Sequence, residues 1–525
     1  MDYFALVEAR GTEDLGPAEV EAGLAAAAAH IQQHASRAPE RIGVLLQRFV
    51  YTDQDWCSPR AGALALGVLK ALGRGVPGGG EIATGRAIEA LVRLAGSSGP
   101  DAADDALACV ANAMLLQPAC RPHVAQRRCL DAVAAVLRAR AESPDAAFLC
   151  ARCLLLALSA GEDARYCVED LGLQQILADA AAHHMRREAA GAGAGARFPP
   201  RQVVAELFKA ALGLCTHFLR WVHAAKGSSG RDDALPADRA AAFVGLLRAA
   251  LDTLAGLPLL ADGHLPDPAK QAIAIAMNIP TRHPEEVRDA WLPAGDPWRF
   301  VDAILDRLAA MVGRIVGEEP AARLADAADG YCGELTPLAL VLMRLVAEHA
   351  SVREHAFPAF YPGSAIDHSL LPEDRPGLSA KLVRLMRIPQ GGMLPAAIGD
   401  LLLALLGGDI KHFVMAVGYG NAAGYMVARG IPVPSDIVEQ VAAGSGPVVD
   451  PVTGRHLGQG AAAAAAAAEL AAMTDEEKMR EAERLFVLFE RLDRTGVIRV
   501  ENPVRAAAES GRLAEVVDDS DDDSQ

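Results

Sequence analysis

The feature that most constrains the fold is a succession of apolar runs between Pro17 and Gly430, most of them ended by glycine or proline. Within a run of about 11–17 residues, apolar residues recur at intervals of three and four, the spacing of one helix face. Glycine and proline are the residues at which helices stop. The pattern predicts an all-α fold built from many short helices. Examples are the runs at 59–73, 85–96, 104–116, 127–140 and 145–161.

Four of these runs resemble one another, which indicates a repeat. They begin at Leu107, Leu149, Leu207 and Ile273, so that successive starts are 42, 58 and 66 residues apart. Armadillo and HEAT units span about 40–47 residues, and loop-like insertions at 189–200 and 226–236 would lengthen the later units. The sequence therefore predicts an armadillo/HEAT-like α-solenoid superhelix over residues 1–430. An irregular helical bundle stays open as the alternative.

The composition changes after residue 430. Residues 431–472 are rich in proline, glycine and alanine and predict a flexible loop, which includes eight consecutive alanines at 461–468. Residues 473–512 predict a C-terminal helical segment, because Thr474 and Glu477 form a capping box ahead of an amphipathic run. Residues 513–525 are acidic and are expected to be disordered. The helical segment could clamp a partner or cap the end of the array, and the pattern favours neither.

Charge and cysteine usage exclude several classes of function. The chain of 525 residues has a net charge of −17, of which the last eleven residues contribute six negative charges. An acidic body repels a phosphate backbone, so nucleic acid is not an expected partner. Nine scattered cysteines, among them Cys150 and Cys153 in an apolar run, are interpreted as buried thiols rather than as a redox or zinc pair.

No pattern of catalytic or metal-ligating residues occurs in the sequence. The glycine-rich stretch at 73–85 lacks the lysine and hydroxyl residue that end a phosphate-binding loop. Hydrolase, metalloprotease and kinase signatures do not occur, and the histidines lack ligand spacing. We therefore expect no catalytic residue, no metal and no cofactor. The start of the chain does not resemble a signal peptide, and the sequence contains no stretch of about 20 uncharged apolar residues, so we expect a soluble protein of a reducing compartment.

Three segments resemble the synembryn family of chaperones and nucleotide exchange factors for heterotrimeric G-protein α subunits (Gα). They are residues 381–430, which end in a Y-G-N-A-A-G motif interpreted as a tight turn, 450–454, and 473–512, which resemble the fungal branch. Upstream, 203–214 resembles a family helix that usually carries asparagine where this chain has Gly213. A generic α-solenoid adaptor without exchange activity is the alternative, but such an adaptor has no reason to carry the 473–512 segment.

The resemblance implies an activity exerted by binding alone. The concave face of the superhelix would hold the C-terminal helix of Gα, and the C-terminal segment of this chain would reach the nucleotide domain of Gα. The family binds Gα·GDP, promotes GDP release and stabilises nucleotide-free Gα until GTP binds. A monomer in the cytoplasm is expected, brought to the cell cortex or plasma membrane through Gα.

Candidate partner-binding residues follow from the repeats and from the resemblance. Asn112, Lys209 and Asn278 are expected on the concave face, although the two asparagines could instead cap their own helices and Lys209 could be an ordinary solvated charge. A second group near the end of the array could meet acidic Gα groups or be ordinary solvated charge. It consists of Lys381, Arg384 and Arg387, together with Asn421, whose role comes from the resemblance only.

In the C-terminal segment, Leu485, Phe486 and Phe489 are the predicted apolar anchors. The resemblance also implies regulation by acidophilic kinases, which need acidic residues after the hydroxyl. Ser520 precedes three aspartates, and Thr474 and Ser435 are weaker candidates. Thr474 is better explained as a helix cap.

Overall fold

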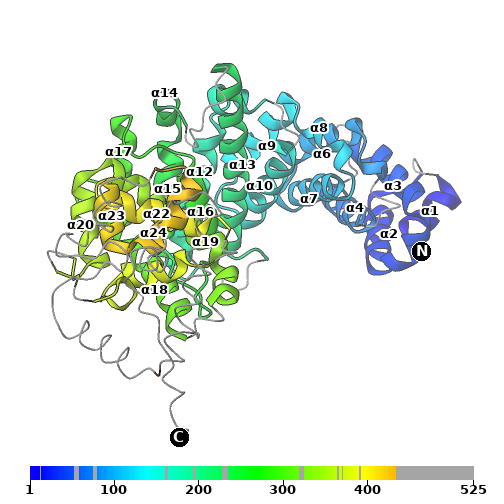
Figure 1. The fold of residues 1–525 in the computed structure, drawn as a ribbon. Coiled ribbons are helices and arrows are strands. Elements are labelled where there is room, and N and C mark those ends of the chain that lie inside the picture. The colour runs from blue at the N-terminus through cyan, green and yellow to red at the C-terminus, as the bar shows by residue number, and fades with distance from the viewer. Residues whose placement is uncertain are drawn as a thin grey trace, which may run out of the picture.

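The computed structural model describes residues 1–11, 14–52, 58–74, 80–159, 163–192, 197–226, 235–318, 324–363, 366–368, 370–388, 392–432 and Thr474. Within these ranges all regular elements are helices and no strand occurs, which confirms the all-α prediction. Figure 1 shows the helices stacked into an arch that runs from the N-terminal helices at the right to α20 and α23 at the left.

One layer of the stack, here called the inner layer, consists of helices that each pack on the next one in the series. It comprises α4 (Pro59–Leu72), α7 (Pro100–Leu116), α10 (Pro144–Leu158), α13 (Pro200–Lys226), α16 (Asp267–Met277), α19 (Leu324–Glu348) and α22 (Leu394–Leu405). At the N-terminal half, α4, α7 and α10 lie on the inside of the arch (Figure 1). The four similar runs of the sequence fall in α7, α10, α13 and α16, so they occupy equivalent places.

The second, outer layer is built in the same way. It comprises α6 (Gly85–Ser97), α9 (Arg127–Ala139), α12 (Leu173–Ala189), α15 (Val244–Gly256), α18 (Arg299–Glu318) and α21 (Leu378–Met386). Each outer helix also packs on the inner helix that follows it in the chain, so the repeating unit is a helix pair. The described residues are therefore arranged as an α-solenoid-like stack in which contacts are made mainly between neighbouring pairs.

Shorter helices connect the pairs and close the two ends. At the N-terminus, α1 and α2 pack together and α2 packs on α4, whereas α24 packs on α22 at the other end. These helices are α1 (Tyr3–Arg10), α2 (Pro17–Ala29), α3 (Ala38–Leu45), α8 (Arg121–Val124), α11 (Ala164–Glu169), α14 (Ala237–Ala240), α17 (Glu285–Trp291), α20 (Ala350–Phe360), α23 (Ile410–Val417) and α24 (Tyr419–Arg429).

Proline and small polar residues determine where the inner helices begin. Ser58 caps α4 through its side chain and Ser143 caps α10, and in both cases proline is the first helical residue. Proline suits this position because its fixed φ is helical and its missing N–H has no partner there anyway. Gly430 ends α24 with a φ of 64°, the left-handed conformation that glycine adopts without strain.

The buried cysteines belong to the cores of the helix pairs. Cys150 and Cys153 are both fully buried in α10, as the sequence predicts. Burial in apolar surroundings raises the pKa of Cys153 to about 12 and raises that of Cys150 well above its usual range. Thiols held in this protonated state are poor nucleophiles and poor metal ligands, so they act as small apolar side chains.

The Y-G-N-A-A-G motif is helical, and the tight turn predicted for it is wrong. The turn lies one residue earlier, at Gly418, whose φ of 80° ends α23 and starts α24. Tyr419 to Gly424 then form the first turns of α24, because Tyr425 anchors this helix on α22. The Tyr425 ring lies directly over Gly399, and its hydroxyl donates a hydrogen bond of 2.8 Å to Asp400.

Two helices, α13 and α19, are long and apolar enough to span a membrane by length and composition. Both belong to the inner layer, where each packs between two neighbours of the same layer and against the outer helices. Their apolar character therefore has an explanation in the stack itself. In α13, 61% of the apolar window is buried inside the molecule, and in α19 44% is.

Candidate partner-binding groove

A basic hollow lies on the inner layer, where α4, α7 and α10 meet; we call it the inner-face hollow. Its lining contains four cationic side chains, one amide and four large apolar or aromatic side chains. They are Lys70, Arg74, Arg152, Arg197, Asn112, Leu115, Phe148, Leu149 and Phe198. Asn112, which the sequence analysis places on the concave face, lies in this hollow. Leu115 is 55% exposed, one of the few large apolar side chains of the described residues left open to solvent.

Aromatic stacking fixes one wall of the inner-face hollow. The rings of Phe148 and Phe198 are stacked with their centroids 3.9 Å apart. The guanidinium of Arg152 lies 5.1 Å from the Phe148 ring centre, and that of Arg197 lies 4.9 Å from the Phe198 ring centre. Cation–π contacts of this kind hold the two guanidinium groups in defined positions.

Ion pairs between neighbouring inner helices also hold cations of this face. Lys70 of α4 pairs with Asp105 of α7, and Arg152 of α10 pairs with Glu206 of α13. The Glu206 carboxylate is buried and also lies 3.6 Å from the ammonium of Lys209. Asp105 and Glu206 thus offset part of the positive charge of this face, and the exposed Arg74 and Arg197 add to it.

The same arrangement recurs further along the inner layer. Lys270 of α16 lies 3.1 Å from the buried carboxylate of Glu334 of α19, which also accepts a hydrogen bond from the backbone of Leu265. Arg344 of α19 donates two hydrogen bonds of 2.7 Å to the carbonyls of Met277 and Ile279. These cations therefore link the consecutive inner helices α16 and α19, and they add polar atoms to the inner face.

Chemically, this surface suits an anionic or helical partner. Within the described ranges, no group of three or more histidine, cysteine, aspartate or glutamate side chains could hold a metal ion. The inner-face hollow combines fixed cations, an amide and exposed apolar surface. A helix that ends a polypeptide matches this combination, since it presents the negative end of its dipole and a terminal carboxylate.

Comparison with known proteins decides the family. A family model described as guanine nucleotide exchange factor synembryn matches residues 65–512, which is most of the chain. The chain belongs to the synembryn family.

Two curated relatives agree with this assignment at modest identity. A synembryn-like chaperone of Schizosaccharomyces pombe is 26% identical over 204 residues, which is 35% of this chain and 36% of the relative. Chaperone Ric-8A of Gallus gallus is 29% identical over 175 residues, or 31% of each chain. The chain thus aligns with about a third of the length of either relative. The synembryn match extends further, from α4 through the 473–512 segment that the sequence analysis singled out.

Lys209 and Asn278, the other two residues predicted for the concave face of this synembryn array, lie in α13 and at the end of α16. Lys209 is 37% exposed in α13 and pairs with Glu206 beside the inner-face hollow. Asn278 ends α16, where its amide donates a hydrogen bond of 2.8 Å to the carbonyl of Ala274. This contact is the helix-capping role that the sequence analysis left open as an alternative to partner binding.

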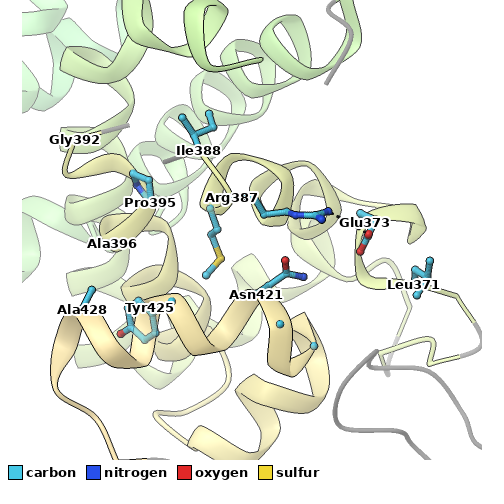
Figure 2. Close-up of a pocket in the computed structure, with 14 residues that line it drawn as sticks. Leu371, Glu373, Arg387, Ile388, Gly392, Pro395, Ala396, Asn421, Tyr425 and Ala428 are labelled. Atoms are coloured by element: carbon cyan, nitrogen blue, oxygen red, sulfur yellow. Dashed lines mark hydrogen bonds and ion pairs between the residues drawn. The ribbon is translucent and has the colours of Figure 1, made fainter. Parts of the chain in front are cut away.

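Lys381, Arg384 and Arg387 lie exposed along α21, at the opposite end of the array. Arg384 donates a hydrogen bond to the carbonyl of Glu373, and Arg387 lies 3.4 Å from its carboxylate (Figure 2). Asn421 lines a second hollow next to these residues, and its amide donates a hydrogen bond to the carbonyl of Val417.

All but one of the candidates that follow Gly430 lie outside the described residues. These are Leu485, Phe486, Phe489, Ser435 and Ser520. Thr474 alone is described, and it is exposed. The helix that Thr474 is predicted to cap lies outside the described residues as well.

Sequence reasoning did not find Arg74, Arg152 and Arg197. Arg152 carried a usable signal, because it is the only charged residue in the apolar part of α10. A lone cation in a buried helix needs a partner, and here that partner is Glu206 of the next inner helix. Arg197 carried no such signal, since its position depends on the stacking of Phe198 on Phe148.

Proposed function

We propose that this chain is a chaperone and guanine nucleotide exchange factor for heterotrimeric G-protein α subunits, and that its array is an armadillo/HEAT-like superhelix. The observation that carries the proposal is the inner-face hollow, which lies in a chain of the synembryn family and suits the C-terminal end of a helix. In this proposal the C-terminal helix of Gα lies along the inner layer, and its carboxylate end lies near Arg74 and Arg197.

Exchange by such a protein requires no catalytic group. An exchange factor lowers the affinity of Gα for GDP because it binds the empty form more tightly than the loaded form, and this coupling is reciprocal. Each tenfold loss of GDP affinity requires about 1.4 kcal/mol of preference for the empty state. Leu115 offers an apolar contact, and Arg74 and Arg197 offer charge complementarity, so the hollow can supply several such steps.

Chaperoning follows from the same preference. A protein that binds Gα before nucleotide does stabilises the incompletely folded form by mass action, and GTP binding then releases it. We therefore place the protein in the cytoplasm, acting as a monomer and reaching membranes through Gα.

The test is GDP release from purified Gα, with and without this protein, together with isolation of the nucleotide-free complex. We expect faster release and a stable empty complex that GTP dissolves. The Arg74→Ala/Arg197→Ala double variant should lose most of the acceleration, and the loss should shrink at high salt because screening weakens the wild-type contact. The matched control is Arg138→Ala/Arg248→Ala, which removes two exposed cations from outer helices α9 and α15. Absence of binding to any Gα would leave the generic adaptor as the function.

A further inference from the structure

The C-terminal end of the array carries a second hollow, between α21, α22 and α24, which we call the terminal hollow. Its volume is about 820 Å³, within the range of about 300–1,000 Å³ typical of ligand clefts. Gly420, Gly424 and Ala428 of α24 line it at intervals of four residues, which places them in one row on the helix. Figure 2 shows Asn421, Tyr425 and Ala428 on this helix, opposite Pro395 and Ala396 of α22. A row of such small side chains lets another helix approach closely.

Apolar surface around the terminal hollow is left uncovered by the described residues. Met393 is 67% exposed and Val427 is 62% exposed, and each is adjacent in sequence to a residue that lines the hollow. Leu370, beside the lining residue Leu371, is 38% exposed. Three of the six exposed large apolar side chains of the described ranges are therefore next in sequence to residues that line this hollow. The last unit of a solenoid normally carries a polar cap, so a bare apolar end indicates that something covers it.

The rim of the terminal hollow is basic on the α21 side. Arg387 lines the hollow, and Arg384 and Lys381 follow at intervals of three residues along the same exposed face of α21. Glu373 contacts both arginines and offsets part of this charge, while Lys381 lies over Gly313 of α18. An occupant of this hollow should therefore present an apolar stripe flanked by acids.

The 473–512 segment of the same chain has this pattern. On a helical projection six of its apolar residues form one stripe, with three glutamates spaced by seven residues along one flank. The stripe consists of Met479, Ala482, Leu485, Phe486, Phe489 and Leu492, and the glutamates are Glu476, Glu483 and Glu490. The chain leaves α24 at Gly430, two residues after Ala428 of the hollow, and residues 431–472 provide more than enough length to return.

We propose that residues 473–492 dock as a helix in the terminal hollow of their own chain, with Phe486 and Phe489 over the small residues of α24 and the glutamates against the basic rim of α21. The docked segment covers the end of the array when no partner is bound. It is then withheld from any partner until it is displaced. If the proposed function holds, this contact is a latch on the segment that the synembryn resemblance assigns to the nucleotide domain of Gα.

Hydrogen exchange of the full-length protein alone tests the latch, and Gly424→Leu is the variant of choice. A Cβ built on Gly424 meets no atom within 4 Å, so a leucine fits the array but fills the hollow. Gly330→Leu is the matched control, because Gly330 is an exposed glycine of α19 that is equally open. We expect amides of 479–492 to exchange at least tenfold slower than unstructured peptide in the wild type and the control. In Gly424→Leu they should approach the unstructured rate.

Equal exchange of 479–492 in wild type and Gly424→Leu, whether fast or slow, would overturn the proposal. A charge exchange adds a second criterion: Arg387→Glu should speed exchange of the segment, and adding Glu483→Arg/Glu490→Arg should restore protection. Failure of the second change to restore protection would exclude the proposed register. Because Gα takes no part in these measurements, their outcome is independent of the GDP-release test.

Discussion

At the scale of single residues, the interior of this array contains polar groups whose partners are backbone carbonyls or side chains of a neighbouring helix. His184 of α12 is fully buried, and its Nε2 lies 2.9 Å from the carbonyl of Ala141. Its Nδ1 finds no hydrogen-bond partner among the described residues. The imidazole is therefore held neutral, with Nε2–H as the donor, and burial lowers its pKa to about 4.

We predict that His184 makes stability fall as the pH decreases from about 6.5 to 4. The unfolded chain takes up this proton near pH 6.5, whereas the folded chain resists it until about pH 4. Protonation in this window therefore favours unfolding, by ~3 kcal/mol at pH 4. Urea titrations of wild type and His184→Gln at several pH values measure the difference, and glutamine keeps a donor for Ala141. Parallel pH profiles of the two proteins would contradict the prediction.

Arg152 gives a second prediction at this scale. Arg152→Ala leaves the buried Glu206 carboxylate with Lys209 as its remaining cation, and we expect a loss of about 3 kcal/mol in unfolding free energy. In Arg152→Ala/Glu206→Gln no carboxylate needs a counter-charge, so the loss should be smaller than the sum of the single losses. Denaturant unfolding of the three variants measures the coupling. Simple additivity would show that the pair contributes nothing.

At the scale of helices, close approach between α22 and α24 depends on a glycine. Gly399→Ala places a methyl group inside the Tyr425 ring, so we expect a loss of about 1–3 kcal/mol and faster hydrogen exchange in α24. Gly330→Ala, at an open position of α19, should instead stabilise by up to about 1 kcal/mol because alanine favours the helix. The same chemical change thus has opposite signs at the two positions. Equal effects would refute the packing argument.

Helix positions were readable from the sequence, whereas contacts between helices were not. Apolar periodicity, proline at helix starts and glycine at helix ends place α4, α7 and α10 correctly, because these signals are local. The turn predicted at Tyr419 to Gly424 was wrong because Tyr425, packed on Gly399, makes those glycines part of a helix. Arg74 and Arg197 escaped detection in the same way, since segments distant in sequence bring them to Asn112.

At the scale of the whole molecule, contacts mainly between neighbouring pairs predict local rather than global responses to core mutations. Leu66→Ala in α4 and Leu401→Ala in α22 each remove a fully buried side chain, at a cost of about 2–5 kcal/mol. Hydrogen exchange should accelerate around the mutated pair and remain unchanged at the far end of the array. Acceleration along the entire chain in both variants would indicate a single cooperative unit instead.

The buried thiols give the array a natural set of reporters. Cys109, Cys129, Cys150, Cys167 and Cys215 lie in α7, α9, α10, α11 and α13, and all are buried. A thiol-alkylating reagent reaches such a sulfur only after its helix pair has opened. The time at which a cysteine is modified therefore reports when its helix pair opens. Mass mapping of the adducts over time would thus rank the pairs by their opening rates without any engineered label. A partner that binds the array would slow the alkylation of cysteines in the helix pairs that it contacts.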